Sequence, residues 1–276
     1  MKQRFGLIGD PIKLSLSPSL FRAAYNGAYG YDLIEGSDFD ASYMRFLKEY
    51  KAINVTAPFK EKAFLKADSA TQECRAIGAA NILLKNGDGS ITAANSDSMG
   101  VSGALETVLQ NKTDRPDEAL VVGCGGAAKA AIYAALTSGF SVTVINCNLE
   151  KAEVYAERMS RLGFEGRIAA KSIDTFCECF RRSGVIIYTL PLAIPGIQEL
   201  TGQDIRGGSY GTQAKYILEA NYKNPAFSGG ILATMQKGNP ELTYISGREW
   251  LLHQAIGAYR IFTGDEPDIE AMRKVL

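Results

Sequence analysis

Short apolar runs alternate with amphipathic stretches along almost the whole chain, and this alternation limits the fold more than any other feature. Runs such as 5–8, 53–56 and 119–122 are typical of buried strands, and the stretch 42–51 has the spacing of a helix. When a helix joins two neighbouring strands of one sheet, the connection is right-handed and the strands are parallel. The pattern therefore predicts an α/β protein with mainly parallel sheets.

The alternation occurs in two series, which indicates two domains. At 276 residues the chain is long for a single hydrophobic core. The first series includes a helical stretch over 61–77 and a hairpin turn at Asn86-Gly-Asp-Gly89, and it stops near residue 100. The second series starts at residue 119 and predicts a doubly wound, Rossmann-like nucleotide-binding domain.

Composition and charge exclude several classes of protein. The chain is 46% hydrophobic and 22% charged, as globular proteins are, and its formal net charge is zero. A zero net charge gives no electrostatic footprint for nucleic acid or for an anionic membrane. No apolar run approaches the roughly 20 residues of a membrane span, and the first one is too short for a signal peptide. We therefore expect a cytoplasmic protein without a nucleic-acid or membrane partner.

Cysteine and histidine usage excludes further kinds of site. The five cysteines are scattered and odd in number, so a disulfide framework is not expected. Cys177 and Cys179 are separated by one residue, which is poor spacing for zinc ligands. His253 is the only histidine, which argues against a hydrolase triad with a histidine base and against a histidine metal site. We expect no metal.

Lys60 lies in a segment whose backbone geometry is strongly restricted. Residues 52–55 form a short apolar run, Pro58 ends it because it lacks a backbone N–H, and Lys60 opens the next helical stretch. A lysine in the first turn of a helix is ordinarily solvated, so its position alone does not assign it a role.

A glycine-rich turn follows the apolar run 119–122 and opens an alanine-rich helix. Glycine lets the backbone approach a pyrophosphate closely, and a helix N-terminus offers unpaired N–H groups and a partial positive charge. Another strand follows at 141–146, as in a dinucleotide-binding fold. The expected cofactor-binding residues of this turn are Gly123, Gly125, Gly126 and Ala127.

Taken together, these segments resemble the shikimate dehydrogenase family. Asn54-Val-Thr-Ala-Pro-Phe-Lys-Glu61 is similar to the family signature that carries its catalytic lysine, and Asn95-Ser-Asp-Ser-Met-Gly100 is similar to the segment that carries the lysine's aspartate partner. The Gly-x-Gly-Gly-Ala turn is also similar to that of the family. The resemblance implies that Lys60 and Asp97 are catalytic. From its position alone, Asp97 could equally be a helix cap.

The resemblance also implies a substrate site. Gly9 to Pro18 is similar to the family's N-terminal motif, in which two serines bind the substrate carboxylate, and hydroxyls at i and i+2 of an extended segment can both do so. Ser17, which precedes Pro18, is also expected to be a helix N-cap. Similar family segments extend the site to Ser15, Ser17, Thr56, Asn81, Tyr222 and Gln254. These neutral hydrogen-bonding groups suit a small polyhydroxylated carboxylate.

The domain boundaries follow from the same resemblance. Gln254 has to reach a pocket built mostly by residues before 100, so the C-terminal residues should return to the first domain. We predict a substrate-binding catalytic domain of residues 1–100 plus 238–276 and a Rossmann-like domain of residues 101–237. The implied activity is the reversible NAD(P)H-dependent reduction of 3-dehydroshikimate to shikimate, by a monomer or a homodimer.

The choice of cofactor is less constrained. NADP-using members of the family carry Asn-Arg-Thr where this chain has Asn146-Cys147-Asn148, and that arginine pairs with the 2′-phosphate. The acidic residue that would favour NAD is absent as well. Lys151 could meet the phosphate as a point charge. We expect NADP, held in part by Asn146 and Lys151, with NAD as the alternative.

Three other functions stay open. The chain could be a quinate/shikimate dehydrogenase that uses NAD, a non-catalytic sensor of a shikimate-type ligand, or another nicotinamide-dependent enzyme with two lobes. Retention of both Lys60 and Asp97 argues against the sensor, because binding alone needs no proton-transfer pair. The serine and Asn81 motifs argue against the unrelated enzyme.

Overall fold

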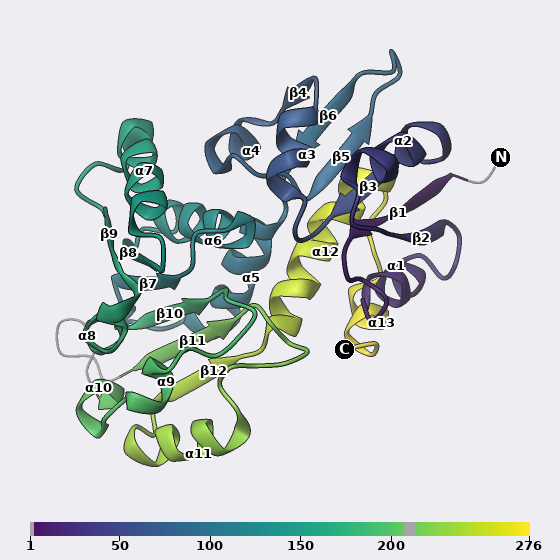
Figure 1. The fold of residues 1–276 in the computed structure, drawn as a ribbon. Helices are drawn as coiled ribbons and strands as arrows, with labels where there is room; N and C mark the ends of the chain where they lie inside the picture. Colours follow the sequence, from purple (N-terminus) through teal and green to yellow (C-terminus); the bar gives the residue numbers. More distant parts are fainter. Residues whose placement is uncertain (1–2, 207–213) are drawn as a thin grey trace. The chain divides into compact units, whose positions relative to one another are not determined.

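The computed structural model describes residues 3–206 and 214–276, which form two compact units (Figure 1). Unit 1 consists of Met1–Gly100 and Leu251–Leu276, and unit 2 of Val101–Trp250. Each unit is built on a six-stranded sheet. The predicted α/β class with mainly parallel sheets is confirmed.

The sheet of unit 1 is mixed. In spatial order its strands are β2 (Gly30–Glu35), β1 (Arg4–Gly9), β3 (Ala52–Val55), β5 (Ile82–Lys85), β6 (Ile91–Ala94) and β4 (Ser69–Ala70). β1 is parallel to β2 and β3, whereas β5 and β6 form the antiparallel hairpin that the turn at residues 86–89 predicts. Because β1 and β3 are parallel, the segments that follow them leave the sheet at the same edge.

Helices cover this sheet on both sides. They are α1 (Ser17–Ala24), α2 (Phe39–Glu49), α3 (Lys60–Lys66), α4 (Gln72–Ile77), α13 (Ile269–Arg273), the start of α5 (Asp97–Leu109) and the end of α12 (Gly247–Thr263). The returning C-terminal segment completes an aromatic core, in which Phe262 stacks on Phe5 with ring centroids 5.2 Å apart and Tyr259 meets Phe21 edge-on at 4.7 Å. Such pairs stabilise a core beyond the apolar area they bury.

The helix expected over 61–77 is interrupted. α3 ends at Lys66, the two-residue strand β4 follows, and α4 starts after Thr71, whose hydroxyl caps it by accepting from the Cys74 N–H. The Asp68 carboxylate accepts from the Ile91 N–H at 2.7 Å, and the Asp68 N–H donates to the Ile91 carbonyl. The helix does not continue because these bonds to β6 replace helical hydrogen bonds. Asp and Thr side chains readily accept from backbone N–H groups outside helices.

The sheet of unit 2 is parallel between all neighbouring strands. Its spatial order is β12 (Leu242–Ile245), β11 (Lys215–Glu219), β10 (Val185–Tyr188), β7 (Glu118–Val122), β8 (Ser141–Asn146) and β9 (Ile168–Ser172). Read from β7 as the first strand, this is the order 3-2-1-4-5-6 of dinucleotide-binding folds, with its switch point between β7 and β10.

Both faces of this sheet are buried, as a parallel sheet requires. Ala119 and Val121 of β7 pack with α6 (Gly126–Thr137) and α7 (Leu149–Met159), whereas Leu120 and Val122 face the other side. The helical segments on that other side are α8 (Phe176–Arg182), α9 (Gly196–Glu199), α10 (Gly202–Arg206) and α11 (Gly229–Gly238). Alternate residues of one strand thus serve two cores.

The expected boundary at residue 238 differs from the division that the structure shows. Residues 238–250 belong to unit 2 because β12 pairs with β11 along the parallel sheet. The chain returns to unit 1 only within α12. Neither β11 nor β12 is predicted from the sequence. β11 begins and ends with a charged residue, and β12 is short and half-exposed in its middle.

Lys215 is completely buried in unit 2. Its ammonium donates to the carbonyls of Phe180 (2.6 Å) and Ser183 (2.9 Å) at the end of α8, and lies 4.7 Å from the Phe180 ring centroid. Burial lowers the pKa of Lys215 to about 7, although the charge of Asp204 acts in the opposite direction. The lysine closes the C-terminal end of a helix at a cost in desolvation.

This burial makes stability depend on pH. Between about pH 7 and pH 10 the unfolded chain holds a proton on Lys215 that the folded chain lacks, so the free energy of unfolding should rise with pH by up to about 1.4 kcal/mol per pH unit. Lys215→Met should remove this part of the slope in denaturant titrations across that range. Lys237→Met, at an exposed lysine of the same unit, is the control. Equal slopes in wild type and Lys215→Met would contradict the assignment.

Candidate active site

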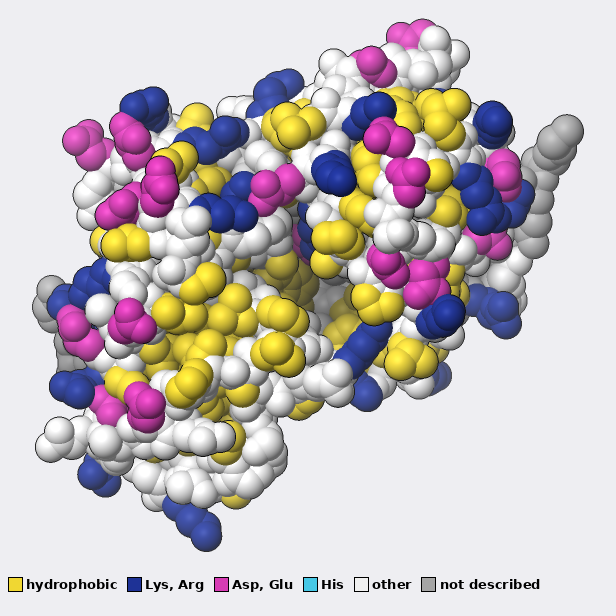
Figure 2. Space-filling model, viewed as in Figure 1, with side chains coloured by type: hydrophobic (Ala, Val, Ile, Leu, Met, Phe, Trp, Pro, Cys, Tyr) yellow, Lys and Arg dark blue, Asp and Glu magenta, His cyan; other side chains and the backbone are white. Residues whose placement is uncertain are grey.

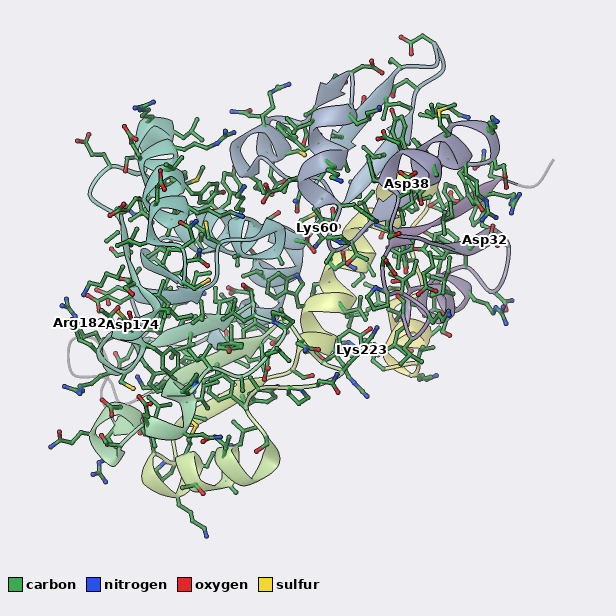
Figure 3. The ribbon with its side chains drawn as sticks, viewed as in Figure 1. Asp32, Asp38, Lys60, Asp174, Arg182 and Lys223 are labelled. Atoms are coloured by element: carbon green, nitrogen blue, oxygen red, sulfur yellow. The ribbon has the colours of Figure 1, made fainter. Side chains whose placement is uncertain are left out.

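Lys60 is the first residue of α3, as the sequence predicts (Figure 3). The Thr56 N–H donates to the Ile8 carbonyl at the end of β1, and the Phe59 N–H donates back to the Thr56 carbonyl, which closes the turn around Pro58. Phe59 itself is buried and anchors the start of the helix. The Lys60 side chain is therefore delivered from a fixed backbone and is only 13% exposed.

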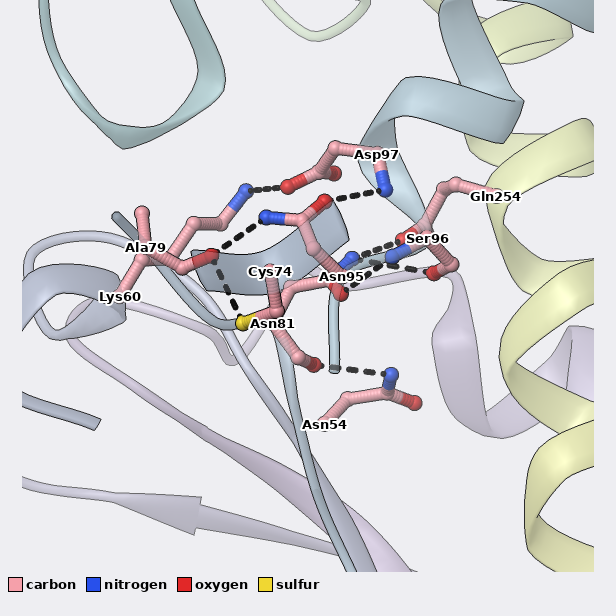
Figure 4. A network of polar contacts seen from close by, with 9 residues as sticks. All are labelled: Asn54, Lys60, Cys74, Ala79, Asn81, Asn95, Ser96, Asp97 and Gln254. Carbon is pink, nitrogen blue, oxygen red and sulfur yellow. Dashed lines mark hydrogen bonds and ion pairs between the residues drawn. The ribbon is translucent and has the colours of Figure 1, made fainter. Parts of the chain in front are cut away.

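Lys60 and Asp97 form an ion pair. The Lys60 ammonium donates to the Asp97 carboxylate at 2.6 Å, and the carboxylate is 6% exposed (Figure 4). Charge-assisted hydrogen bonds of this length are among the stronger ones in proteins. Asp97 is the first residue of α5, and its own N–H donates to the Asn95 side chain at 2.8 Å. Asp97 is therefore the first residue inside the helix, and Asn95 satisfies its N–H.

Asn81 and Gln254 meet although 173 residues separate them. The Asn81 amide donates to the Gln254 side-chain carbonyl at 3.0 Å and to the Ser96 hydroxyl at 3.1 Å. Its own carbonyl oxygen accepts from the Ser96 N–H at 2.8 Å. Gly257, one turn after Gln254, lies against α5, where an added Cβ would come within 3.5 Å of the Ser96 Cβ. The structure thus unites two predicted site residues through a close helix contact.

Ser15 and Ser17 also lie together, but Ser17 is not the helix cap that we expected. The Ser15 hydroxyl donates to Ser17 Oγ at 3.1 Å and accepts from the Ser17 N–H at 3.2 Å. The Leu20 N–H bonds to the Leu16 carbonyl, so the turn begins one residue earlier and Ser17 lies inside α1. Its hydroxyl is therefore not committed to capping the helix.

Three residues that the sequence did not single out support these groups. The Tyr31 hydroxyl donates to Asn54 Oδ1 at 2.9 Å, the Asn54 amide donates to the Asn81 carbonyl at 3.2 Å, and the Tyr259 hydroxyl donates to the Ser17 carbonyl at 3.1 Å. Burial raises the pKa of Tyr31, and a hydrogen bond from Ser17 opposes this shift. A polar residue inside a buried strand, such as Asn54, was the one signal available.

Thr56 follows β3 and is half-buried. It lies against Gly9 at the end of β1, where an added Cβ would clash with the Thr56 methyl group. Ser15, Ser17, Thr56, Lys60, Asn81, Asp97 and Gln254 all belong to unit 1. Tyr222 belongs to unit 2, in the segment after β11, and its ring has the Lys223 ammonium 5.9 Å from the centroid.

The buried Glu219 carboxylate fixes the loop after β11, which carries Tyr222. Glu219, at the end of β11, accepts from the N–H groups of Ala226 and Phe227 and from the Tyr244 hydroxyl. Burial and the Glu219 charge raise the pKa of Tyr244, which stays a neutral donor. One side chain thereby closes the loop that carries Tyr222.

The glycine turn of unit 2 has the features that a pyrophosphate site needs. Gly123 has φ +109°, and a Cβ there would come within 2.6 Å of Thr189 Oγ1. Around Gly125, the residue before α6, an added Cβ would meet no described atom within 4 Å, and no side chain among the described residues caps the helix. The first N–H groups of α6 can therefore face a bound anion at the switch point of the sheet.

The surroundings of this turn are apolar on one side. An added Cβ at Gly123 would lie 3.1 Å from Leu190, and Leu192 in the same segment is 75% exposed. Figure 2 shows hydrophobic side chains gathered over the part of unit 2 that carries β10 and α9, with acidic and basic side chains interspersed elsewhere on the visible face.

The segment after β8 is built by asparagines. The Asn146 amide donates to the Asn148 carbonyl at 2.8 Å, and Asn148 caps α7 by accepting from the Lys151 N–H at 2.9 Å. Cys147 and the Lys151 side chain are exposed. Asn146 thus shapes the turn, and the exposed Lys151 side chain lies in the first turn of α7.

Two kinds of feature are absent from residues 3–206 and 214–276. Within these ranges, no three His, Cys, Asp or Glu side chains gather as they would around a metal ion. In the same part of the chain, no helix is both long and apolar enough to span a membrane.

Comparison with known proteins identifies the family. The model of the shikimate dehydrogenase substrate-binding domain matches residues 7–83, and that of the shikimate 5′-dehydrogenase C-terminal domain matches residues 247–276. A shikimate dehydrogenase (NADP(+)) of Methanosarcina mazei is 32% identical over 100% of this chain and 98% of its own length. The chain belongs to the shikimate dehydrogenase family.

Solved structures agree with this membership in the shikimate dehydrogenase family. The shikimate 5-dehydrogenase of Thermus thermophilus, in complex with shikimate, superposes with a TM-score of 0.78 at 25% identity and covers 99% of this chain and 97% of its own. The quinate dehydrogenase of Corynebacterium glutamicum, in complex with NAD, gives 0.81 at 22% identity and covers 99% and 98%. At that identity the second likeness shows the fold alone.

Because of the close contact at Gly9, replacing this glycine should destabilise the fold. Gly9→Ala should lower the free energy of unfolding by about 1–3 kcal/mol, because the new methyl group forces Thr56 and Ile12 apart. At Gly87 a Cβ would meet no described atom within 4 Å, so Gly87→Ala is the matched control and should change stability by less than about 0.5 kcal/mol. Denaturant titration compares the two. Equal changes in the free energy of unfolding for both variants would show that the end of β1 accommodates the methyl group without destabilising the fold.

Proposed function

We propose that this member of the shikimate dehydrogenase family catalyses the reversible NADPH-dependent reduction of 3-dehydroshikimate to shikimate. The observation that carries the proposal is the nearly buried Lys60–Asp97 pair, which shares unit 1 with the Asn81–Gln254 pair and the two serines. Curated relatives that act as shikimate dehydrogenases (NADP(+)) support the reaction and the cofactor.

The substrate would be held through its polar groups. The hydroxyls of Ser15 and Ser17 would donate to the carboxylate, while Thr56, Asn81 and Gln254 would pair with ring hydroxyls. The family resemblance also implies that Tyr222 contacts the substrate carboxylate. Because each group is a neutral donor or acceptor in a fixed place, a ligand that lacks a hydroxyl leaves a polar group unpaired and is strongly rejected.

The chemistry at the carbonyl assigns separate roles to the ion pair. When bound, the reduced nicotinamide supplies a hydride to C3 of the substrate. Negative charge then develops on the carbonyl oxygen, and the Lys60 ammonium stabilises it and delivers the proton that makes the hydroxyl. Asp97 orients the ammonium through the 2.6 Å contact. In the reverse direction the same pair accepts the proton.

The residues of unit 2 fit a dinucleotide. Gly123, Gly125 and the start of α6 would hold the pyrophosphate, together with Gly126 and Ala127 at the first turn of that helix. Lys151 would face the 2′-phosphate near Asn146. Cys147 stands where an arginine would recognise that phosphate, so this chain relies on one flexible ammonium. We propose the cytoplasm as the compartment and a monomer or homodimer as the active form.

A second candidate is a quinate/shikimate dehydrogenase that uses NAD. The observation in its favour is the absence of an arginine from residues 146–148, which weakens the case for a 2′-phosphate. A non-catalytic sensor would instead bind shikimate without turning it over.

The proposed role of Lys60 has a direct test. Lys60→Ala should lower kcat by about 100-fold or more, because the general acid is lost, while KM for shikimate changes little. Lys62→Ala, two residues along the same helix, should keep the wild-type kcat. Absorbance of the reduced nicotinamide is followed with shikimate and with quinate, each with NADP and with NAD.

The outcomes separate the candidates. Turnover of shikimate with NADP supports the proposal, preference for quinate with NAD supports the second candidate, and wild-type inactivity in all four mixtures supports the sensor. A kcat for Lys60→Ala within twofold of wild type would end the catalytic assignment of this residue.

Lys151 should govern the choice between the two cofactors. Lys151→Ala should raise KM for NADP by about tenfold or more, since a charged contact to phosphate contributes about 1.5–3 kcal/mol. KM for NAD should stay unchanged and serves as the internal control, because NAD lacks the 2′-phosphate. An equal rise in KM for both cofactors would show that Lys151 does not act through the 2′-phosphate.

A further inference from the structure

Both members of the Lys60–Asp97 pair are attached to the same short segment, Ala79 to Asn81. The Ala80 N–H donates to the Lys60 carbonyl at 2.8 Å. On the other side, the Asn95 amide donates to the Ala79 carbonyl at 2.7 Å (Figure 4). The backbone that carries the ammonium and the backbone that leads to the carboxylate therefore rest on two consecutive residues.

Asn95 closes this connection with both ends of its side chain. Its Oδ1 accepts from the Asp97 N–H at 2.8 Å, while its Nδ2 reaches the Ala79 carbonyl. Asn95 is 3% exposed. One partner can only donate and the other can only accept, so the position requires a side chain that accepts at one end and donates at the other. Asparagine meets this requirement and aspartate, when ionised, does not.

The same segment also carries a group of the proposed substrate site. Asn81 continues directly from Ala79 and Ala80, and its N–H donates to the Ala94 carbonyl at 3.2 Å, just before Asn95. The Asn81 side chain contacts Gln254 and Ser96. A shift of the segment would move the proton-transfer pair relative to the groups that hold the substrate. Displacements of about 1 Å can cost about 100-fold in rate.

We propose that Asn95 is a positioning residue, which sets the geometry of the Lys60–Asp97 pair for proton transfer. This inference rests on the proposed dehydrogenase function. Asn95 acts through the Asp97 backbone and through Ala79, so its loss should slow the chemical step and leave the contacts of the serines with the substrate carboxylate in place.

Asn95→Asp tests the role with a group whose donor ability can be switched by pH. The neutral acid can accept from the Asp97 N–H and donate to the Ala79 carbonyl, as the amide does. The carboxylate instead directs a charged oxygen at that carbonyl. The kcat of Asn95→Asp relative to wild type should therefore fall by about tenfold or more from about pH 6 to about pH 9, with KM for shikimate within about threefold.

Two further variants serve as comparisons. Asn95→Ala loses both bonds and cannot titrate, so its kcat should be lowered by a factor that is the same at every pH. Asn86→Asp introduces the same charge in the β5–β6 hairpin turn, where Asn86 donates to the Ser90 and Thr92 hydroxyls at 2.9 Å each, and it should keep wild-type kinetics. Denaturant titration of all three variants checks that each is folded in the assay.

The pH dependence of kcat in the two Asn95 variants tests the positioning role of Asn95. A pH-dependent kcat ratio for Asn95→Asp, beside a constant one for Asn95→Ala, supports it. The same constant ratio for both, wild-type kcat in both, or a loss carried by KM would overturn it. If Asn95→Asp does not fold, a lowered kcat with unchanged KM in Asn95→Ala supports the role, and any other pattern opposes it. An inactive wild type overturns the proposed function first and this inference with it.

Discussion

A lysine and an aspartate that are almost out of contact with water must stay together, and the first unit is arranged around this requirement. Removing one partner from a buried pair typically costs about 3–5 kcal/mol, because the remaining charge is stranded. The pair costs desolvation as well, so it adds little net stability compared with apolar residues of the same size. Such an arrangement suits a charge that is held ready for a reaction.

The surrounding structure meets the requirement by fixing backbones more than side chains. α3 starts after a turn that is hydrogen-bonded to β1, and α5 starts at a residue whose N–H donates to Asn95. Hydrogen bonds join both helix starts to the segment at Ala79. A lysine has several rotatable bonds, and its freedom is reduced when both its origin and its partner are fixed. The neutral groups around Asn81 and Gln254 are organised in the same way, by helices that approach closely at Gly257.

The sequence allowed the frame and the chemistry of the site to be predicted, and the misses have physical causes. Lys60 and its preceding strand follow from local chemistry, whereas the partnership with Asp97 needed a family resemblance, because no local rule brings residues 60 and 97 together. The cap expected at Ser17 failed because the turn begins one residue earlier. The helix over 61–77 failed because Asp68 prefers the backbone of β6, a tertiary contact that periodicity does not reveal.

The position of α12 has a consequence for how the protein is made. Gln254 in its middle completes the proposed substrate site, and Tyr259 and Phe262 near its end complete the aromatic core begun by Phe5. All of unit 2 lies between these residues and the rest of unit 1 in the chain. On the ribosome, the face of the first sheet that α1 and α12 share is therefore covered only by α1 until unit 2 has been synthesised, and unit 2 is the first of the two that can finish folding.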